Sequence, residues 1–177
     1  MNRKQLIAQA ALQLFAERGF ENTSTALIAK EAEVSEALIF KHFGNKDHLL
    51  DYIIRNGYKR VIEQGRGRLP ENAPLELIYK IIDLPYTLVQ EEPAFWKLQN
   101  RLVDVAVART QHERFLQPLP GLLVTAFRQL GYEQPDKEAR LLMLLVEVLW
   151  KSLATQDHGD IPEMLAFIKT KYRAQTT

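Results

Sequence analysis

The sequence contains no cysteine among its 177 residues. Disulfide bonds, thiolate metal sites and a cysteine nucleophile are therefore excluded. Long apolar stretches are also missing, because the longest unbroken run, Leu141–Val146, falls far short of the roughly 20 residues needed to span a bilayer. The N-terminal segment does not resemble a signal peptide, since glutamines interrupt its apolar residues and no small-residue cleavage site follows. We expect a cytoplasmic protein that does not engage a membrane.

Net charge is nearly absent as well. The 23 basic and 22 acidic side chains leave a formal charge of +1, which gives no global sign of a polyanionic partner. Residues 1–50 are neutral, and the positive surplus lies in residues 51–70. A hydrophobic content of 46% with 25% charged residues is ordinary for a globular protein and excludes wholesale disorder.

Strand-like alternation is missing throughout, whereas apolar residues recur at helical spacing nearly everywhere. The pattern predicts an all-α fold, with an N-terminal helix-turn-helix head of three short helices and a C-terminal bundle of five or six helices. Residues 65–74, which contain two glycines and two prolines, form the clearest linker. The expected later helices lie near residues 46–64, 74–90, 93–111, 119–130, 136–156 and 161–173.

Residues 23–43 have the pattern of a helix, a tight turn and a second helix. Thr23 or Ser24 is a suitable N-cap for the first of these helices and Ser35 for the second, because hydroxyl side chains accept hydrogen bonds from first-turn N–H groups. In a helix-turn-helix, the second helix enters the major groove of DNA. The residues left to face outward on that helix are Ser35, Glu36, Leu38, Lys41 and His42.

A long motif occupies the first quarter of the chain. It consists of Ile7-Ala8, Ala10-Ala11-Leu12, Leu14–Phe20, Thr23-Ser24, Ile28-Ala29, Ala32, Val34-Ser35, Phe40, His42-Phe43, Lys46-Asp47 and Leu49-Leu50. In this motif the sequence resembles the TetR family of bacterial transcriptional regulators. The resemblance implies a helix-turn-helix DNA-binding domain at residues 1–50. It also implies a helical domain at residues 51–177 that binds a small-molecule effector and dimerises through its last two long helices.

Three kinds of DNA contact are implied when the family's contacts are carried over position by position. Contacts with phosphate are expected from Thr23, Ser24 and Thr25. Contacts with base edges are expected from Ser35, Glu36, Ala37, Leu38 and Lys41. Contacts with the sugar-phosphate backbone are expected from Phe40, His42 and Lys46. The alternatives are that Glu36, Lys41, Lys46 and His42 are ordinary surface residues that make no contact.

The sequence departs from the family's usual residues at four of these or neighbouring positions. The family often has Gly where Glu33 stands, Lys or Arg at Glu36, a small or hydroxyl residue at Leu38, and Tyr at Phe40. A carboxylate repels phosphate, but it accepts a hydrogen bond from the amino group of cytosine, and a leucine packs on the methyl group of thymine. We hypothesise that Glu36 and Leu38 give the protein an unusual operator sequence.

The second part of the chain offers candidates for an effector site and a dimer interface. The effector candidates are Tyr79, Tyr86, Phe95, Trp96 and Glu147, with core packing as the alternative for the aromatic residues and solvent or an interface for Glu147. The helix near 136–156 is apolar on more than one stripe, and such extra apolar surface suggests a partner. The interface candidates are Leu141, Leu145, Val148, Leu165, Ile168 and Tyr172, with burial inside the monomer as the alternative.

Enzyme chemistry has little support in the sequence. The four histidines form no pair at metal-ligand spacing on one helix, and residues 157–160 are interpreted as a polar loop. We therefore expect no enzyme, no metal and no cofactor. The sequence predicts a ligand-responsive regulator, in this family most often a repressor, that binds a pseudo-palindromic operator in double-stranded DNA as a homodimer. The alternative is an all-α interaction module or effector-binding protein that has lost specific DNA binding.

Overall fold

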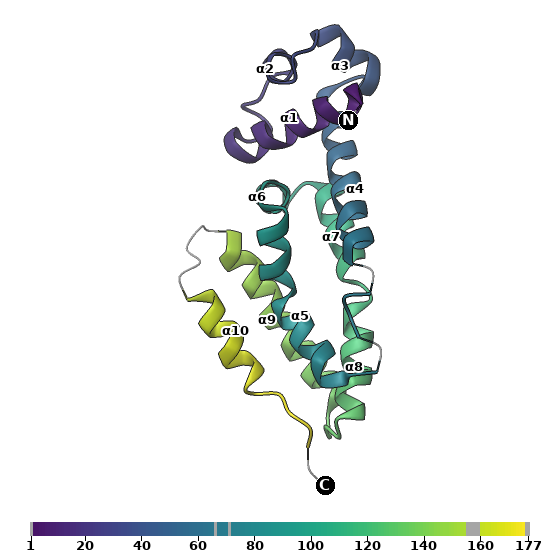
Figure 1. Cartoon of the computed structure of the whole chain (residues 1–177), viewed down its shortest axis with the longest axis vertical. Coiled ribbons are helices and arrows are strands. Elements are labelled where there is room, and N and C mark those ends of the chain that lie inside the picture. The colour runs from purple at the N-terminus through teal and green to yellow at the C-terminus, as the bar shows by residue number, and fades with distance from the viewer. Residues whose placement is uncertain (1, 66, 71, 155–159, 176–177) are drawn as a thin grey trace. The chain divides into compact units, whose positions relative to one another are not determined.

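The computed structural model describes residues 2–65, 67–70, 72–154 and 160–175, and within these ranges the chain is helical without a strand. The all-α prediction is confirmed (Figure 1). The helices are α1 (Arg3–Arg18), α2 (Thr25–Glu31), α3 (Glu36–Phe43), α4 (Lys46–Gly65), α5 (Pro74–Glu91), α6 (Pro93–Arg101), α7 (Ala106–Leu116), α8 (Leu119–Gln129), α9 (Pro135–Ala154) and α10 (Ile161–Lys169). No helix in the described part of the chain is long and apolar enough to cross a membrane.

Packing divides the chain into two compact units. Unit 1 consists of residues 1–60 and 92–112, and unit 2 consists of residues 61–91 and 113–177. The helix α4 thus contributes its first three-quarters to unit 1. The functional division predicted at residue 50 stays a prediction, because packing units and functional regions need not share a boundary.

Unit 1 is built around α1, which packs against α2, α3 and α6. Asn2 caps α1 through a reciprocal capping box with Gln5, in which each side chain accepts from the other residue's backbone N–H at 2.9 Å. The apolar stripe of α1 is buried, and the largest fully buried side chains of this unit are Ile7, Phe15, Ile28, Ile39, Leu49, Ile54, Phe95 and Leu98. This core fixes α3 through Ile39 and leaves its other face outside.

The helix expected at residues 93–111 is two helices, so that part of the prediction is wrong. The α6 helix ends at Arg101 and α7 begins at Ala106, with two tight turns closed by Leu102 N–H to Gln99 C=O and Val105 N–H to Leu102 C=O. The buried Gln99 amide donates to the carbonyl of Ala108 at 3.0 Å. This side-chain bond joins the two helices across the turn, and periodicity alone does not reveal it.

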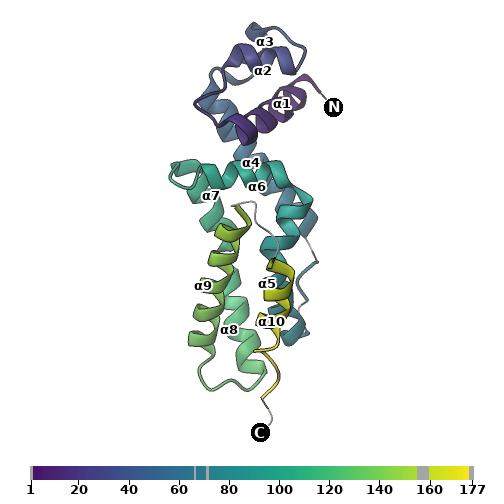
Figure 2. The same ribbon diagram turned by 90° about the vertical axis from the view of Figure 1, so that its left-hand side faces the viewer.

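Unit 2 has α5 packed against α8, α9 and α10 (Figure 2). The inner face of α9 carries Ala139, Leu142, Val146, Leu149 and Leu153, which are all buried. These residues recur at intervals of three and four, so they form one helical stripe. The opposite face of α9 is exposed, including three large apolar side chains.

The last helix ends earlier than expected, at Lys169 rather than near residue 173. The chain beyond it is held in a non-helical path by bonds to other elements: the N–H of Arg173 donates to the Tyr132 hydroxyl at 3.1 Å, and the N–H of Gln175 donates to the carbonyl of Leu130 at 2.9 Å. The buried Tyr172 packs on Phe127 with ring centroids 5.4 Å apart. These tertiary contacts replace the next helical turn.

Candidate nucleic-acid interface

The turn between α2 and α3 is tight because one residue adopts a left-handed backbone. Glu33 has a φ of 52°, and its N–H donates to the carbonyl of Lys30 at 3.2 Å, while the N–H of Val34 donates to Ala29 at 2.9 Å. Only glycine takes this conformation without strain, which costs other residues roughly 1–2 kcal/mol. The geometry therefore explains why glycine is expected at this position, and it shows that this chain forms the same turn with glutamate.

The two predicted capping serines behave differently. The hydroxyl of Ser24 accepts from the N–H of Leu27 at 3.1 Å and so caps α2. Ser35 has the extended backbone of an N-cap residue, but its side chain makes no capping hydrogen bond to α3. Because Ser35 is exposed, its hydroxyl and the first N–H groups of α3 remain available to a ligand.

The three residues expected to touch phosphate lie in three different environments. Thr23 is fully buried, and its hydroxyl donates to the carbonyl of Gly19 at 2.8 Å, so the expectation that it faces DNA is not supported by its position. Ser24 is exposed at the start of α2. Thr25 is half-buried, and its hydroxyl donates to the carboxylate of Glu36. This bond links the first residue of α2 to the first residue of α3, and sequence spacing gave no sign of it.

The α3 helix separates into a buried and an exposed face, as expected. Ile39 and Phe43 are buried in the core of unit 1. The predicted contact residues of this helix are half-buried at Leu38 and His42 and exposed at the others, namely Ser35, Glu36, Ala37, Phe40 and Lys41. The structure thus brings hydroxyl, carboxylate, aromatic and ammonium groups together on one helix face.

Lys46 makes contacts inside the chain. Its ammonium group donates to the carbonyl of Phe20 at 2.9 Å and lies 4.2 Å from the centroid of the Phe20 ring. Both contacts stabilise the charge where it is. Lys46 can therefore contact phosphate only if its side chain leaves this position or if another N–H of its ammonium group donates to the phosphate. Lys41 is exposed and needs no such change.

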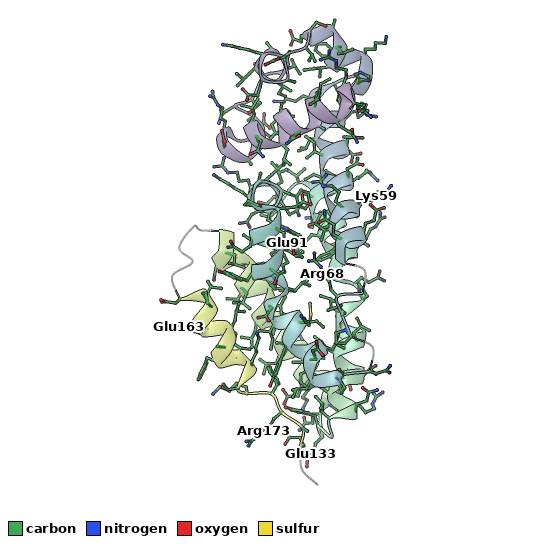
Figure 3. The ribbon with its side chains drawn as sticks, viewed as in Figure 1. Lys59, Arg68, Glu91, Glu133, Glu163 and Arg173 are labelled. Atoms are coloured by element: carbon green, nitrogen blue, oxygen red, sulfur yellow. The ribbon has the colours of Figure 1, made fainter. Side chains whose placement is uncertain are left out.

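The basic stretch at residues 51–70 is largely neutralised by carboxylates. Arg55 pairs with Asp51 at 2.7 Å, Arg60 with Glu92 at 2.6 Å, and Arg68 with Glu91 at 2.8 Å; Figure 3 labels Arg68 and Glu91. The hydrogen bond to Asp51 raises the pKa of Arg55 further above its usual value. These pairs reduce the positive charge that this stretch can offer to a polyanion.

The expected effector residues fall into separate groups. Phe95 and Trp96 are buried in unit 1, where they contact each other and Tyr58 edge-on with centroids 5.1 to 5.7 Å apart. The Tyr58 hydroxyl lies 2.9 Å from Nδ1 of His112, and burial raises the pKa of Tyr58 above its ordinary value. The rings of Phe95 and Trp96 are buried against each other and against Tyr58. This supports the alternative of core packing for Phe95 and Trp96.

The other three effector candidates lie in unit 2. The hydroxyl of Tyr79 donates to the carbonyl of Tyr172 at 3.0 Å, and Tyr86 packs against the core while half-buried. Glu147 is exposed on the outer face of α9. Among the described residues, no group of three or more histidines and carboxylates is placed to hold a metal ion, and residues 157–159 of the predicted loop lie outside that description.

The expected interface residues are likewise divided between two faces. Leu141 and Val148 are exposed and Leu145 is half-buried, whereas Leu165, Ile168 and Tyr172 are buried in the core of unit 2. The helix α10 packs against α5, so Leu165 and Ile168 point into the core of unit 2. The exposed apolar residues of α10 are instead Met164 and Phe167, so the burial of Leu165, Ile168 and Tyr172 supports the alternative of burial inside the monomer.

Comparison with known proteins finds similar sequences among bacterial transcriptional regulators. The family model described as bacterial regulatory proteins, tetR family, matches residues 7–53, which include α2, α3 and the turn between them. The transcriptional regulator HbdR from Aromatoleum sp. is 43% identical over 54 residues, which cover 30% of this chain and 24% of HbdR. The transcriptional repressor Rv3405c from Mycobacterium tuberculosis is 34% identical over 105 residues, which cover 56% of this chain and 53% of the repressor.

The likeness to solved structures extends along the whole chain. The crystal structure of AibR in complex with isovaleryl coenzyme A and operator DNA has a TM-score of 0.72 with 20% identity, covering 99% of this chain and 100% of that one. At this identity the likeness shows the fold alone. The two sequence matches above span a quarter to about half of those relatives' length, and the family model matches the region that contains the helix-turn-helix.

Proposed function

We propose, on the premise that this chain belongs to the TetR family of bacterial regulatory proteins, that it is a transcriptional regulator whose α3 binds in the major groove of double-stranded DNA. The observation that carries the proposal is the exposed start of α3. Ser35 is an N-cap residue with an unused hydroxyl, and it follows a strained tight turn at Glu33. A helix N-terminus with free N–H groups favours phosphate, and the exposed face beyond it is suited to base edges.

We also propose that the protein acts as a homodimer. Five large apolar side chains on α9 and α10 are between 47% and 58% exposed: Leu141, Leu144, Val148, Met164 and Phe167. Several exposed apolar side chains on the last two helices of a chain are typical of an interaction surface. A two-fold dimer would present two copies of α3 to successive major grooves roughly 34 Å apart, which requires a pseudo-palindromic operator.

Regulation by a small-molecule effector and repression complete the proposal. Support comes from the named proteins: one relative is called a repressor, and AibR was crystallised with both isovaleryl coenzyme A and operator DNA. An effector changes DNA binding only if it binds the DNA-competent and DNA-incompetent conformations with different affinity. We place the effector in the helices of unit 2, since the rings of Phe95 and Trp96 are fully packed in unit 1.

The test is selection of genomic DNA fragments by the purified full-length protein, followed by titration of the selected fragment. A matched pair of lysine variants makes it specific. Lys41→Ala changes the exposed face of α3, and Lys80→Ala removes another exposed lysine, on α5. We expect enrichment of a two-fold symmetric sequence, weakened severalfold by Lys41→Ala and unchanged by Lys80→Ala. No enrichment, or equal effects of the two variants, would contradict DNA binding through α3 and favour an interaction module.

A further inference from the structure

The exposed face of α9 carries a seam with coiled-coil spacing. Lys137, Leu141, Leu144, Val148 and Lys151 follow one another at intervals of four and three residues, and all five are exposed. This is the alternation of a and d positions in a heptad repeat. The seam lies opposite the stripe that α9 buries in unit 2, so the helix has two apolar faces, and the monomer covers only one of them.

Two opposite charges flank the seam on the same side. Arg140 and Glu147 are one heptad apart, at the position before each a residue, and both are exposed. Neither forms an ion pair with another residue in the described part of the chain. One heptad corresponds to about 10.5 Å along the helix, so the two groups are too far apart to pair with each other within one chain.

We propose that α9 packs antiparallel against α9 of a second copy in one fixed register, in which Arg140 of each subunit pairs with Glu147 of the other. The proposal rests on the homodimer proposed above and adds its geometry. In this register Leu141 lies opposite the partner's Leu144, and the two-fold axis crosses the helix between Leu142 and Met143. Lys137 lies opposite the partner's Val148, where its aliphatic stem covers valine while the ammonium group reaches water.

The charges select this register over its neighbours. In an antiparallel pair, residues preceding the a positions face one another across the seam, and their charges set partner choice and alignment. A shift by one heptad in one direction places Glu147 opposite the partner's Glu147 and Leu141 opposite the partner's Lys151. The opposite shift places Arg140 opposite the partner's Arg140. Of these three registers, only the central one joins opposite charges and leucine with leucine.

The experiment uses charge reversal in the full-length protein. Arg140→Glu and Glu147→Arg each convert both symmetric ion pairs of the dimer into like-charge pairs, and we expect each to raise the dimer Kd about tenfold or more at low salt. The variant carrying both substitutions regains two opposite-charge pairs, so its Kd should return to within about threefold of the original. Sedimentation equilibrium measures these constants, and far-ultraviolet circular dichroism confirms that every variant is folded.

Mixing the two single variants gives the most specific result. A heterodimer of Arg140→Glu with Glu147→Arg restores both pairs, Arg with Glu and Glu with Arg, whereas neither homodimer does. With one variant labelled with ¹⁵N, native mass spectrometry should show heterodimer well above the one half expected from random exchange. The matched controls are Lys80→Glu and Glu133→Arg, which reverse exposed charges on α5 and before α9; Figure 3 labels Glu133. Both controls should leave the Kd unchanged.

The outcomes separate the two proposals. A protein that stays monomeric at all accessible concentrations overturns the homodimer and the register together. A dimer whose Kd is unaffected by both single reversals, and whose variants mix at random, retains the homodimer but overturns the register. Failure of the double variant to recover, with its fold intact, likewise shows that Arg140 and Glu147 do not face one another.

Discussion

Replacement of Gly57 by alanine is expected to destabilise unit 1, although alanine is the better helix former. Gly57 lies inside α4, and a Cβ atom there would be 2.0 Å from Cε2 and 2.5 Å from Cδ2 of Phe95. Carbon atoms need about 3.5–4.0 Å, so the ring or the helix must move by about 1.5 Å. Phe95 is fully buried, with Tyr58 at 5.3 Å and Trp96 at 5.1 Å between centroids, which leaves no empty side to move toward.

The expected magnitude follows from two opposing terms. Overpacking of a filled core costs about 1–3 kcal/mol, whereas exchanging glycine for alanine within a helix gains about 1 kcal/mol. A Cβ only 2.0 Å from a buried ring atom belongs at the upper end of the overpacking range, about 2–3 kcal/mol, so the net loss for Gly57→Ala is about 1–2 kcal/mol. Gly121→Ala is the matched control, because a Cβ there meets no atom within 4 Å and only the helix term applies. It should stabilise the protein by up to about 1 kcal/mol, so the two variants change stability in opposite directions.

Urea unfolding, monitored by tryptophan fluorescence, measures the change in the stability of unit 1. Trp96 and Trp150 are the two tryptophans of the chain, and a Trp150→Phe background leaves Trp96, in unit 1, as the reporter. Phe95→Leu removes the ring and should recover part of the loss from Gly57→Ala, with a coupling of about 1 kcal/mol or more in the double-mutant cycle. If Gly57→Ala is neutral or stabilising in this background, the close approach of α4 and Phe95 is refuted.

Three further predictions concern the α2–α3 region and its DNA. Glu33→Gly should raise the free energy of unfolding by about 0.5–1 kcal/mol, because relief of left-handed strain exceeds the added entropy of the unfolded chain; a thermal melt that does not shift upward contradicts the strained turn. Ser24→Ala should cost about 1 kcal/mol of stability by removing a cap, whereas Ser35→Ala should leave stability unchanged and weaken operator binding about tenfold, as gel-shift titration beside urea unfolding can show. The logarithm of the binding constant should fall with the logarithm of salt concentration with a slope of about −4 to −5 for the dimer, at roughly −0.9 per neutralised phosphate; a slope near −10 would mean that Arg55, Arg60 and Arg68 leave their carboxylates to contact DNA.

Local signals in the sequence located the helix-turn-helix because they depend on neighbouring residues. The cap at Ser24 is predicted by a hydroxyl side chain before apolar periodicity, and its hydrogen bond is present at 3.1 Å. The end of α3 at Gly44, with a φ of 79°, follows from the freedom of glycine. Most helix limits are therefore close to those expected.

Long-range contacts account for what the sequence left open. Thr23 and Ser24 are equivalent as caps by sequence, and only the fold shows that the Thr23 hydroxyl bonds to the α1 terminus. The same limit applies to α10, where Leu165 and Phe167 are both apolar, and the position of α5 decides which of them is buried. The break between α6 and α7 is bridged by the bond from Gln99 to Ala108, which no local pattern encodes.

Helix periodicity, capping and a contiguous motif are properties of short segments, and they were enough to predict the all-α fold and the position of the helix-turn-helix. Which of those residues face outward follows from the packing of helices that lie far apart in the chain. It buried Thr23, filled the space around Phe95, and left Leu144 on an uncovered face of α9. A side chain's exposure depends on which distant helix packs against its own helix, and neighbouring residues in the chain do not carry that information.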